Sequence, residues 1–222
     1  TGAVTLFAGA AGTAGTADGV GAAARFQWPS GMATDGTYLY VTDEYNYSIR
    51  RITIADATVT TFAGTSGNVG SADGVGAAAA FNAPTSAAVV GAYLYVSDYY
   101  NCTIRKIELA TAAVTTLAGT AGSCSHADLT GAAARFLGPW ALGTDGTNLY
   151  VSDNIAIRKI ELGTAKVTTY AGLAYIGYGK DTLETIPLTS ATPIGDATSF
   201  MYSPTWGMFF TTPSNIKRIY SE

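Results

Sequence analysis

The segment Leu39-Tyr40-Val41-Thr42-Asp43 occurs again at regular intervals along the chain. It returns as Leu94-Tyr95-Val96-Ser97-Asp98 and as Leu149-Tyr150-Val151-Ser152-Asp153, with 55 residues between successive starts. In the fourth place stands Met208-Phe209-Phe210, followed by Thr212 where the other copies have Asp. Self-similarity at a fixed interval indicates a chain built from one repeated supersecondary unit.

Two further markers keep the same order and nearly the same spacing. One is a Val-Thr run ending in Ala-Gly, at residues 4–9, 59–64, 114–119 and 167–172. The other is an Ile-basic-basic-Ile unit that starts at Ile49, Ile104, Ile157 and Ile216. All three markers are short, alternate apolar with polar residues and are rich in Val, Ile, Thr and Tyr, which is typical of β-strands. The doubled basic pair predicts an exposed outer strand or a bulge.

A fourth candidate strand precedes the Leu-Tyr-Val segment, at residues 31–34 and 140–144. Asp35-Gly36-Thr37 and Asp145-Gly146-Thr147 follow it with the residues of a hairpin turn, since Asp-Gly tolerates positive φ. Each unit is therefore predicted to hold four strands, in the order inner, Leu-Tyr-Val, Ile-basic and Val-Thr. Only the Ala-rich residues 21–26 and their copies could hold a short helical turn.

Four-stranded units at this interval predict an all-β fold, a four-bladed β-propeller of antiparallel blades. We expect one domain over residues 1–222. Its blades are expected at about 30–64, 85–119, 140–172 and 194–222, the last with strand 3–9 added.

The two ends of the chain complement each other. The chain begins with a Val-Thr strand, Val4-Thr5-Leu6-Phe7-Ala8-Gly9, and finishes with an Ile-basic strand whose blade lacks an outer strand. We expect the N-terminal strand to complete blade four of its own ring, which would pair an otherwise open edge. In the alternative, it completes blade four of a neighbouring molecule, and such head-to-tail exchange propagates as a filament.

The recurring phrases resemble those of the NHL-repeat propellers. They are Ala17-Asp18-Gly19, Gly21 to Phe26, Pro29 and Thr34 to Asp43, repeated as Gly131 to Phe136, Pro139 and Thr144 to Asp153. The resemblance implies the propeller fold but no single activity, because propellers host many. It also departs from the family, which commonly has six blades. Some NHL-like propellers are lyases with histidine-bound metals, and this chain has one histidine.

Composition excludes several classes of function. Only 13% of the 222 residues are charged, Lys and Arg number 12, and the net charge is −4, so no nucleic-acid partner is expected. No run of 18 apolar residues occurs, so no membrane insertion is expected. The chain opens at Thr1 without a signal-like run, which favours a processed or excised product.

Cys102 and Cys124 are the two cysteines, and the propeller topology places their loops on one face. A disulfide is the favoured interpretation, and two unpaired buried thiols are the alternative. An even cysteine count in a chain of low charge fits an extracellular, oxidising compartment.

Asp43, Asp98 and Asp153 each end a Leu-Tyr-Val strand. We interpret them as structural, bonding the following amides or pairing with Arg25 or Arg135. The alternative is a ring of carboxylates around a cation, which the missing fourth carboxylate disfavours. We therefore expect no metal and no cofactor.

Tyrosines gather in the loops that follow these aspartates: Tyr45, Tyr47, Tyr99 and Tyr100. Such rings offer a stiff contact surface for a protein or a glycan, or they cover the rim of the blades. Asn46-Tyr47-Ser48 and Asn101-Cys102-Thr103 match the glycosylation acceptor pattern, but both asparagines fall where the repeat needs a turn.

No catalytic constellation is visible. His126 is the single histidine and has no repeated partner, so no catalytic residue is assigned. The sequence predicts a non-enzymatic extracellular scaffold or interaction module for a protein, including itself, or a glycan. A structural filament is the first alternative, and an enzyme that uses the central channel is the second.

Overall fold

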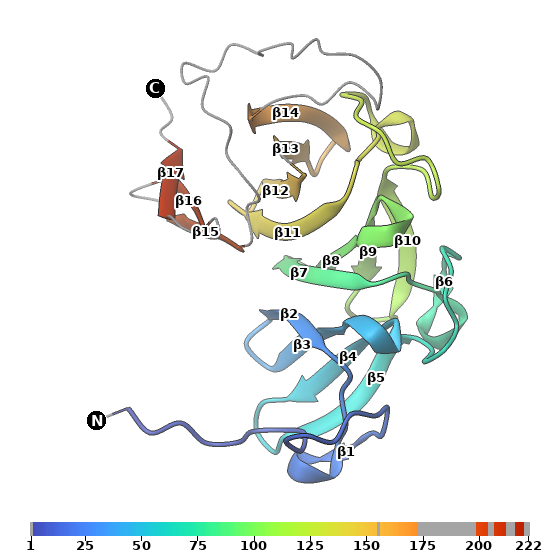
Figure 1. The fold of residues 1–222 in the computed structure, drawn as a ribbon, viewed down its shortest axis with the longest axis vertical. Coiled ribbons are helices and arrows are strands. Elements are labelled where there is room, and N and C mark those ends of the chain that lie inside the picture. The colour runs from blue at the N-terminus through green and yellow to red at the C-terminus, as the bar shows by residue number, and fades with distance from the viewer. Residues whose placement is uncertain (1, 155, 173–198, 204–206, 212–215, 220–222) are drawn as a thin grey trace.

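The computed structural model describes residues 2–154, 156–172, 199–203, 207–211 and 216–219. These residues form antiparallel sheets and short 3₁₀ turns, which confirms the all-β prediction. The sheets stand side by side in an arc, with β2, β7, β11 and β15 innermost (Figure 1). Each innermost strand packs on the next one along the chain. This is the arrangement of propeller blades.

The strand bounds follow the repeat. Blade one holds β2 (Pro29–Thr34), β3 (Tyr38–Asp43), β4 (Ser48–Thr53) and β5 (Thr58–Gly64). Blade two holds β7 (Pro84–Val90), β8 (Tyr93–Asp98), β9 (Thr103–Glu108) and β10 (Ala113–Ala118). Blade three holds β11 (Pro139–Thr144), β12 (Asn148–Asp153), β13 (Ala156–Glu161) and β14 (Lys166–Gly172). The fourth sheet holds β15 (Ser199–Ser203), β16 (Gly207–Thr211) and β17 (Ile216–Ile219), and residues 194–198 expected in it lie outside the described ranges.

Two blades carry a fifth strand that the repeat did not predict. β1 (Gly19–Val20) pairs with β5, and β6 (Gly74–Val75) pairs with β10. Both pairs form because the loop that enters each blade runs along its outer edge before a 3₁₀ turn, η1 (Gly21–Ala23) or η3 (Gly76–Ala78). A third turn, η5 (Gly131–Ala133), enters blade three, so the Ala-rich segments do hold the short turns that were expected.

In blades one, two and three the Ile-basic strands are not exposed outer strands. β4 lies between β3 and β5, and it pairs with β3 without a shift. The register with β5 shifts between Ile49 and Arg50 because β5 has an extra residue, Phe62, so the bulge lies on the Val-Thr strand. Both the exposure and the bulge predicted for the Ile-basic strand were therefore wrong. Arg50 is only 1% exposed. Its side chain is turned inward by two carboxylates, described below.

The core lies between neighbouring blades. Tyr40 and Ile49 of blade one pack with Phe81 and Leu94 on the side of blade two. An equivalent cluster joins blades two and three. The innermost strands approach so closely that a Cβ on Gly31 would lie 2.6 Å from the Cα of Ser86. Glycine at this position therefore allows β2 and β7 to meet.

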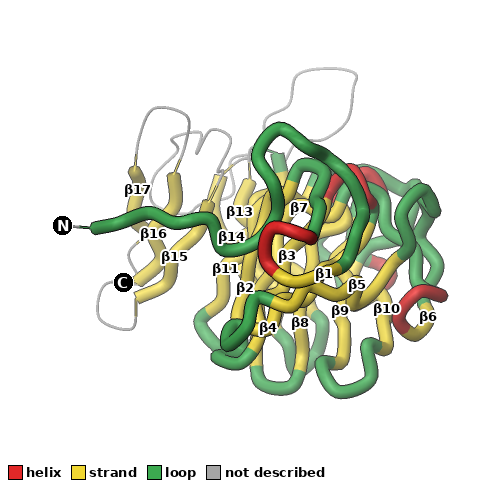
Figure 2. The backbone as a smooth tube through the Cα atoms, turned by 90° about the horizontal axis from the view of Figure 1, so that it is seen from below, coloured by secondary structure: helices red, strands yellow, loops and turns green. Residues whose placement is uncertain are grey.

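The expected pairing of the N-terminal strand within its own ring is not formed. No strand occurs between residues 2 and 18, and the first residues run away from blade one (Figures 1 and 2). β15 packs on β11 while β2 packs on β7, and the arc stays open between blade one and the fourth sheet (Figure 1). β17 lies on the far side of this opening from blade one, so residues 4–9 do not reach the edge of β17 (Figure 1).

Candidate binding face

A buried arginine clamps the loops at one end of each blade. In blade two, Arg105 Nη1 lies 2.9 Å from Asp98 Oδ2 and Nη2 lies 2.8 Å from Asp73 Oδ1. The arginine and Asp98 are fully buried, whereas Asp73 is 48% exposed. The same clamp recurs with Asp18, Asp43 and Arg50 and with Asp128, Asp153 and Arg158.

The arginines proposed from the sequence have another role. Arg25 donates to the carbonyls of Ala22 and Ala24, and Arg135 makes the equivalent bonds in blade three. The pairing of the aspartates with Arg25 and Arg135 was therefore wrong. These two side chains close their own 3₁₀ turns, and the strand arginine occupies the buried position beside the aspartate.

Asp43 and Asp98 also accept from an asparagine side chain in the turn that follows each of them. The backbone amides that bond the three strand-end carboxylates precede the first strand of each blade, so the expected bonds to the following amides are not formed. Asp98 Oδ1 accepts from the Asn82 amide at 2.7 Å, and Oδ2 accepts from Asn101 Nδ2 at 2.7 Å. Burial raises the pKa of Asp98 to about 6, although Arg105 and these donors oppose the rise. The carboxylate is ionised at neutral pH and holds η4 (Tyr99–Asn101) in place.

The two glycosylation acceptor asparagines are part of this framework. Asn101 Nδ2 donates to Asp98 and, at 2.7 Å, to the Gly70 carbonyl, and Asn46 Nδ2 makes the matching bonds to Asp43 and Gly15. Asn46 is 1% exposed and Asn101 is 7% exposed. Their amide nitrogens serve the turns and are not presented to solvent.

Cys102 and Cys124 form a disulfide with a Cα–Cα distance of 5.4 Å. Cys102 follows η4 in blade two, and Cys124 lies in the loop that leads to blade three. The bond therefore crosses the junction between two blades.

The structure separates the four tyrosines into two groups, one on each of two blades. Tyr45 lies on η2 (Glu44–Asn46) and is 46% exposed, with its ring 5.7 Å from that of Trp28. Tyr47 is half-buried and adopts the left-handed conformation that ends this turn.

The second group is larger and spans the junction of blades two and three. Tyr100 is 63% exposed and meets the Tyr99 ring edge-on at 4.9 Å. Tyr99 in turn meets Trp140 of β11 at 5.3 Å. A Cβ on Gly138 would lie 2.9 Å from the Tyr99 ring, so this glycine makes room for the ring at the junction. We call Tyr99, Tyr100 and Trp140 the aromatic cluster.

Comparison of the repeats in the sequence did not identify Trp28 and Trp140 as candidate site residues. Trp28 precedes Pro29, whereas Trp140 follows Pro139, so the two occupy different positions of the repeat. Neither tryptophan recurs at a fixed spacing from the loop tyrosines, so the repeat pattern could not associate the tryptophans with them. Only the fold brings Trp140 to Tyr99.

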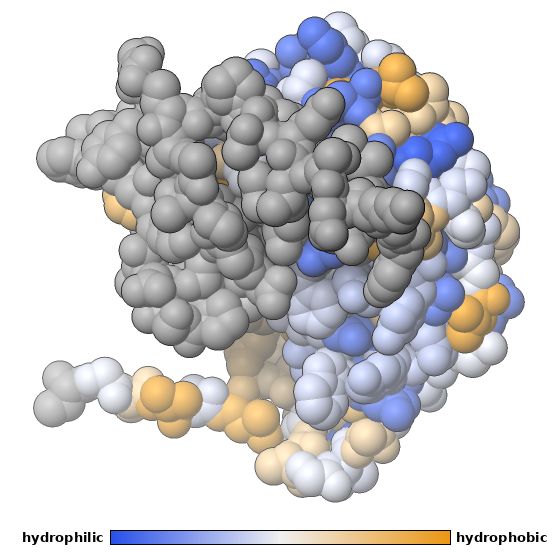
Figure 3. Space-filling view, turned by 45° about the horizontal axis from the view of Figure 1, so that its top comes forward, coloured by the Kyte–Doolittle hydropathy of each residue, from blue (hydrophilic) through white to orange (hydrophobic). Residues whose placement is uncertain are grey.

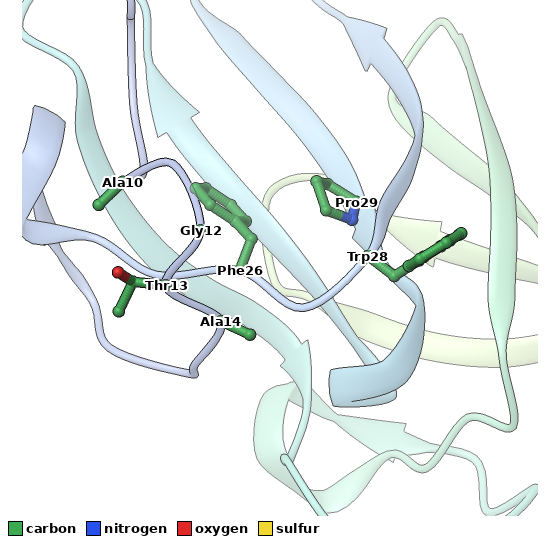
Figure 4. Close-up of a pocket in the computed structure, with 7 residues that line it drawn as sticks. All are labelled: Ala10, Gly12, Thr13, Ala14, Phe26, Trp28 and Pro29. Carbon is green, nitrogen blue, oxygen red and sulfur yellow. The ribbon is translucent and has the colours of Figure 1, made fainter.

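A hollow of about 610 Å³ lies beside Trp28 (Figure 4). Its walls are small or apolar: Ala10, Gly12, Thr13, Ala14, Phe26, Trp28 and Pro29.

His126, the single histidine, lies at the edge of blade three. Its Nε2 is 2.9 Å from Thr169 Oγ1, and burial lowers its pKa to about 4, with the charge of Arg158 adding to the effect. Over the described ranges, no three His, Cys, Asp or Glu side chains are grouped closely enough to hold a metal ion. Within the same ranges, no helix has the length and apolar character needed to cross a membrane.

No family model matches the chain. Protein SUPPRESSOR OF QUENCHING 1, chloroplastic, from Arabidopsis thaliana is 39% identical over 98 residues, which are 43% of this chain and 9% of that protein. The chain thus spans a small part of this curated relative.

Solved structures resemble the chain more completely. An auxiliary nutrient binding protein from Bacteroides ovatus matches with a TM-score of 0.60 and 18% identity, over 84% of this chain and 46% of that one. The nidogen/laminin complex matches with a TM-score of 0.54 and 15% identity, over 86% of this chain and 64% of that one. Identities this low show the fold alone, and they support the β-propeller architecture.

Proposed function

We propose that this chain is a non-enzymatic, extracellular β-propeller that binds a protein or a glycan through the aromatic cluster. The carrying observation is the edge-to-face contact of Tyr100 with Tyr99 and of Tyr99 with Trp140, in which Tyr100 is 63% exposed and Trp140 39% exposed. Tyr and Trp supply large contact areas at low entropic cost and dominate the energetics of recognition surfaces.

Rigidity of the turn supports this proposal. η4 is held by Asp98, Asn101 and the disulfide at Cys102, so the two tyrosines are fixed before a partner arrives. Preorganisation of this kind lowers the cost of binding. Tyr45 on the equivalent turn of blade one and Trp28, which precedes β2, offer a second exposed aromatic pair.

The disulfide supports an extracellular location, because such bonds persist in oxidising compartments. The solved relatives described as nutrient binding proteins agree with a binding role. In the part of the chain that the structure describes, each of the three strand-end aspartates is committed to an arginine of its own blade.

The test is a screen of the purified chain on an array of glycans and an array of secreted proteins. Tyr100→Ala should lower any selective signal at least tenfold, because it removes the most exposed ring of the cluster. Tyr93→Ala is the matched control, since Tyr93 starts β8 and lies at the other end of the same blade. Equal loss in both variants, or no selective signal on either array, would contradict the proposal.

A further inference from the structure

Two segments of this chain match each other in register but are not paired. In each complete blade the Ile-basic strand meets the Val-Thr strand in the same way, with Ile52 opposite Val59 and Ile49 opposite Ala63. Blades two and three repeat this register. The remaining copies of the two sequences are β17 and residues 4–8, and the shared register would set Ile219 opposite Val4 and Ile216 opposite Ala8.

Both segments have an open edge. β17 pairs with β16 on one side, and the described residues place no strand on the other. Residues 4–8 belong to no strand, and Val4 and Leu6 are 99% and 66% exposed. Figure 3 shows this apolar segment standing clear of the rest of the molecule. An exposed apolar strand sequence and an unpaired edge are each a template for pairing.

The face of blade one beside this segment has the composition of a blade junction but no neighbour. Met32 is 69% exposed, whereas Ala87 and Leu142, at the same register position in β7 and β11, are 7% and 6% exposed. Likewise Phe81 and Phe136 are fully buried, while their counterpart Phe26 lines the open hollow of Figure 4.

The loop that forms the other wall of the hollow points to the same neighbour. Residues 10–14 correspond in the repeat to 120–124, and Cys124 in that loop is bonded to Cys102 of the preceding blade. On its other side, the Gly15 carbonyl accepts a hydrogen bond from Asn46 Nδ2 of blade one, the blade that follows this loop. The loop therefore has its contacts on one side and lacks those that a preceding blade would make.

We infer that this face binds the fourth sheet of a second copy of the chain, with residues 4–8 of one copy added to the free edge of β17 in the other. The chain carries both halves of the junction, and in a single copy the opening of the arc separates them (Figure 1). Because the two surfaces differ, the contact is head-to-tail and extends to further copies or closes into a ring.

Cross-linking between different copies tests this inference. The register sets Thr5 opposite Arg218, as Thr60 lies opposite Arg51 in blade one. Chains with Thr5→Cys are mixed with chains that carry Arg218→Cys, and a short bismaleimide is added. We expect a covalent dimer from the mixture and a ladder of oligomers from the double variant. Thr37→Cys, exposed in the turn between β2 and β3, replaces Thr5→Cys in the control and should give no dimer.

Closure within one copy would overturn the inference, and it would appear as an internally linked monomer of the double variant. Absence of any cross-link would overturn it as well. Sedimentation velocity on the unmodified chain gives an independent readout that does not depend on the cysteines. We expect a sedimentation coefficient that rises with concentration and becomes constant when residues 1–9 are deleted. A concentration-independent monomer in the unmodified chain would contradict the inference.

Discussion

Arg105 Nη1 lies 2.9 Å from Asp98 Oδ2, and solvent reaches neither side chain. The pair connects the interior of blade two to the face that carries the aromatic cluster, because Asp98 also accepts from the Asn82 amide and from Asn101 in the tyrosine turn. The same buried ion pair recurs in blades one and three. A framework of buried charges therefore positions surface residues that the hydrophobic core does not touch.

Asp98→Asn should lower the free energy of unfolding by about 3–5 kcal/mol, because an amide nitrogen would face the Arg105, Asn82 and Asn101 donors where the carboxylate oxygens now accept from all three. Asp73→Asn removes the half-exposed partner of the same arginine and should cost about 1 kcal/mol or less. Urea denaturation measures both. If Asp98→Asn does not fold, the Asp98→Leu/Arg105→Met chain should recover a cooperative transition. Equal and small effects of the two asparagine variants would show that the buried pair is unimportant.

Reduction of the disulfide should destabilise the chain by about 3 kcal/mol, as expected when a bond that closes a loop of this length is broken. The loss should be local, because the bond joins one pair of blades only. Hydrogen exchange is expected to speed up in residues 120–125, while residues 65–70, in the equivalent loop without a disulfide, stay unchanged. Uniform acceleration in both loops would contradict this assignment.

Gly31→Ala should separate the first two blades. Its new Cβ would lie 2.6 Å from Ser86 Cα and 2.7 Å from the Thr85 carbonyl oxygen, and backbone atoms cannot rotate away as a side chain can. We expect a loss of about 2 kcal/mol or more by thermal unfolding, similar to other overpacked sites. Gly163→Ala, which meets no atom within 4 Å, is the control and should stay within about 0.5 kcal/mol. Wild-type stability in Gly31→Ala would mean that β2 and β7 do not meet.

His126 should make the chain less stable in mild acid. Its pKa is about 4 in the fold, below the ordinary value of 6.5, so the unfolded chain binds the proton more readily. The stability is fully present above pH 6.5 and is lost as the pH falls toward 4. With solvent screening, the loss at pH 5 is about 1 kcal/mol.

The raised pKa of Asp98 acts in the opposite direction over the same range, because the folded state then takes up the proton first. The effect of His126 is therefore read from the difference between the unmodified chain and His126→Gln at pH 7.5 and pH 5. The variant should lose less stability on acidification. An identical loss in both chains would contradict the assignment.

Sequence analysis predicted the features that depend on local patterns. Alternation gave the strands, Asp35-Gly36 gave a hairpin turn, and the Ala-rich segments gave the 3₁₀ turns. Burial of Arg50 could not be predicted in this way, because its partner Asp18 is 32 residues distant in the sequence. The alternation of apolar and polar residues also does not distinguish a buried arginine from an exposed one. The unpaired residues 4–9 were missed because strand pairing depends on which sheet edge the finished fold brings within reach.

Tryptophan fluorescence tests the central claim, that the aromatic cluster binds the partner, most directly. In a chain with Trp28→Phe and Trp206→Phe, Trp140 is the remaining tryptophan and sits beside Tyr99. Titration with the ligand selected on the arrays should change its emission in a saturable way. Adding Tyr100→Ala should shift the midpoint at least tenfold. Saturable binding by calorimetry with constant Trp140 emission and an unchanged midpoint would place the partner elsewhere and contradict the account.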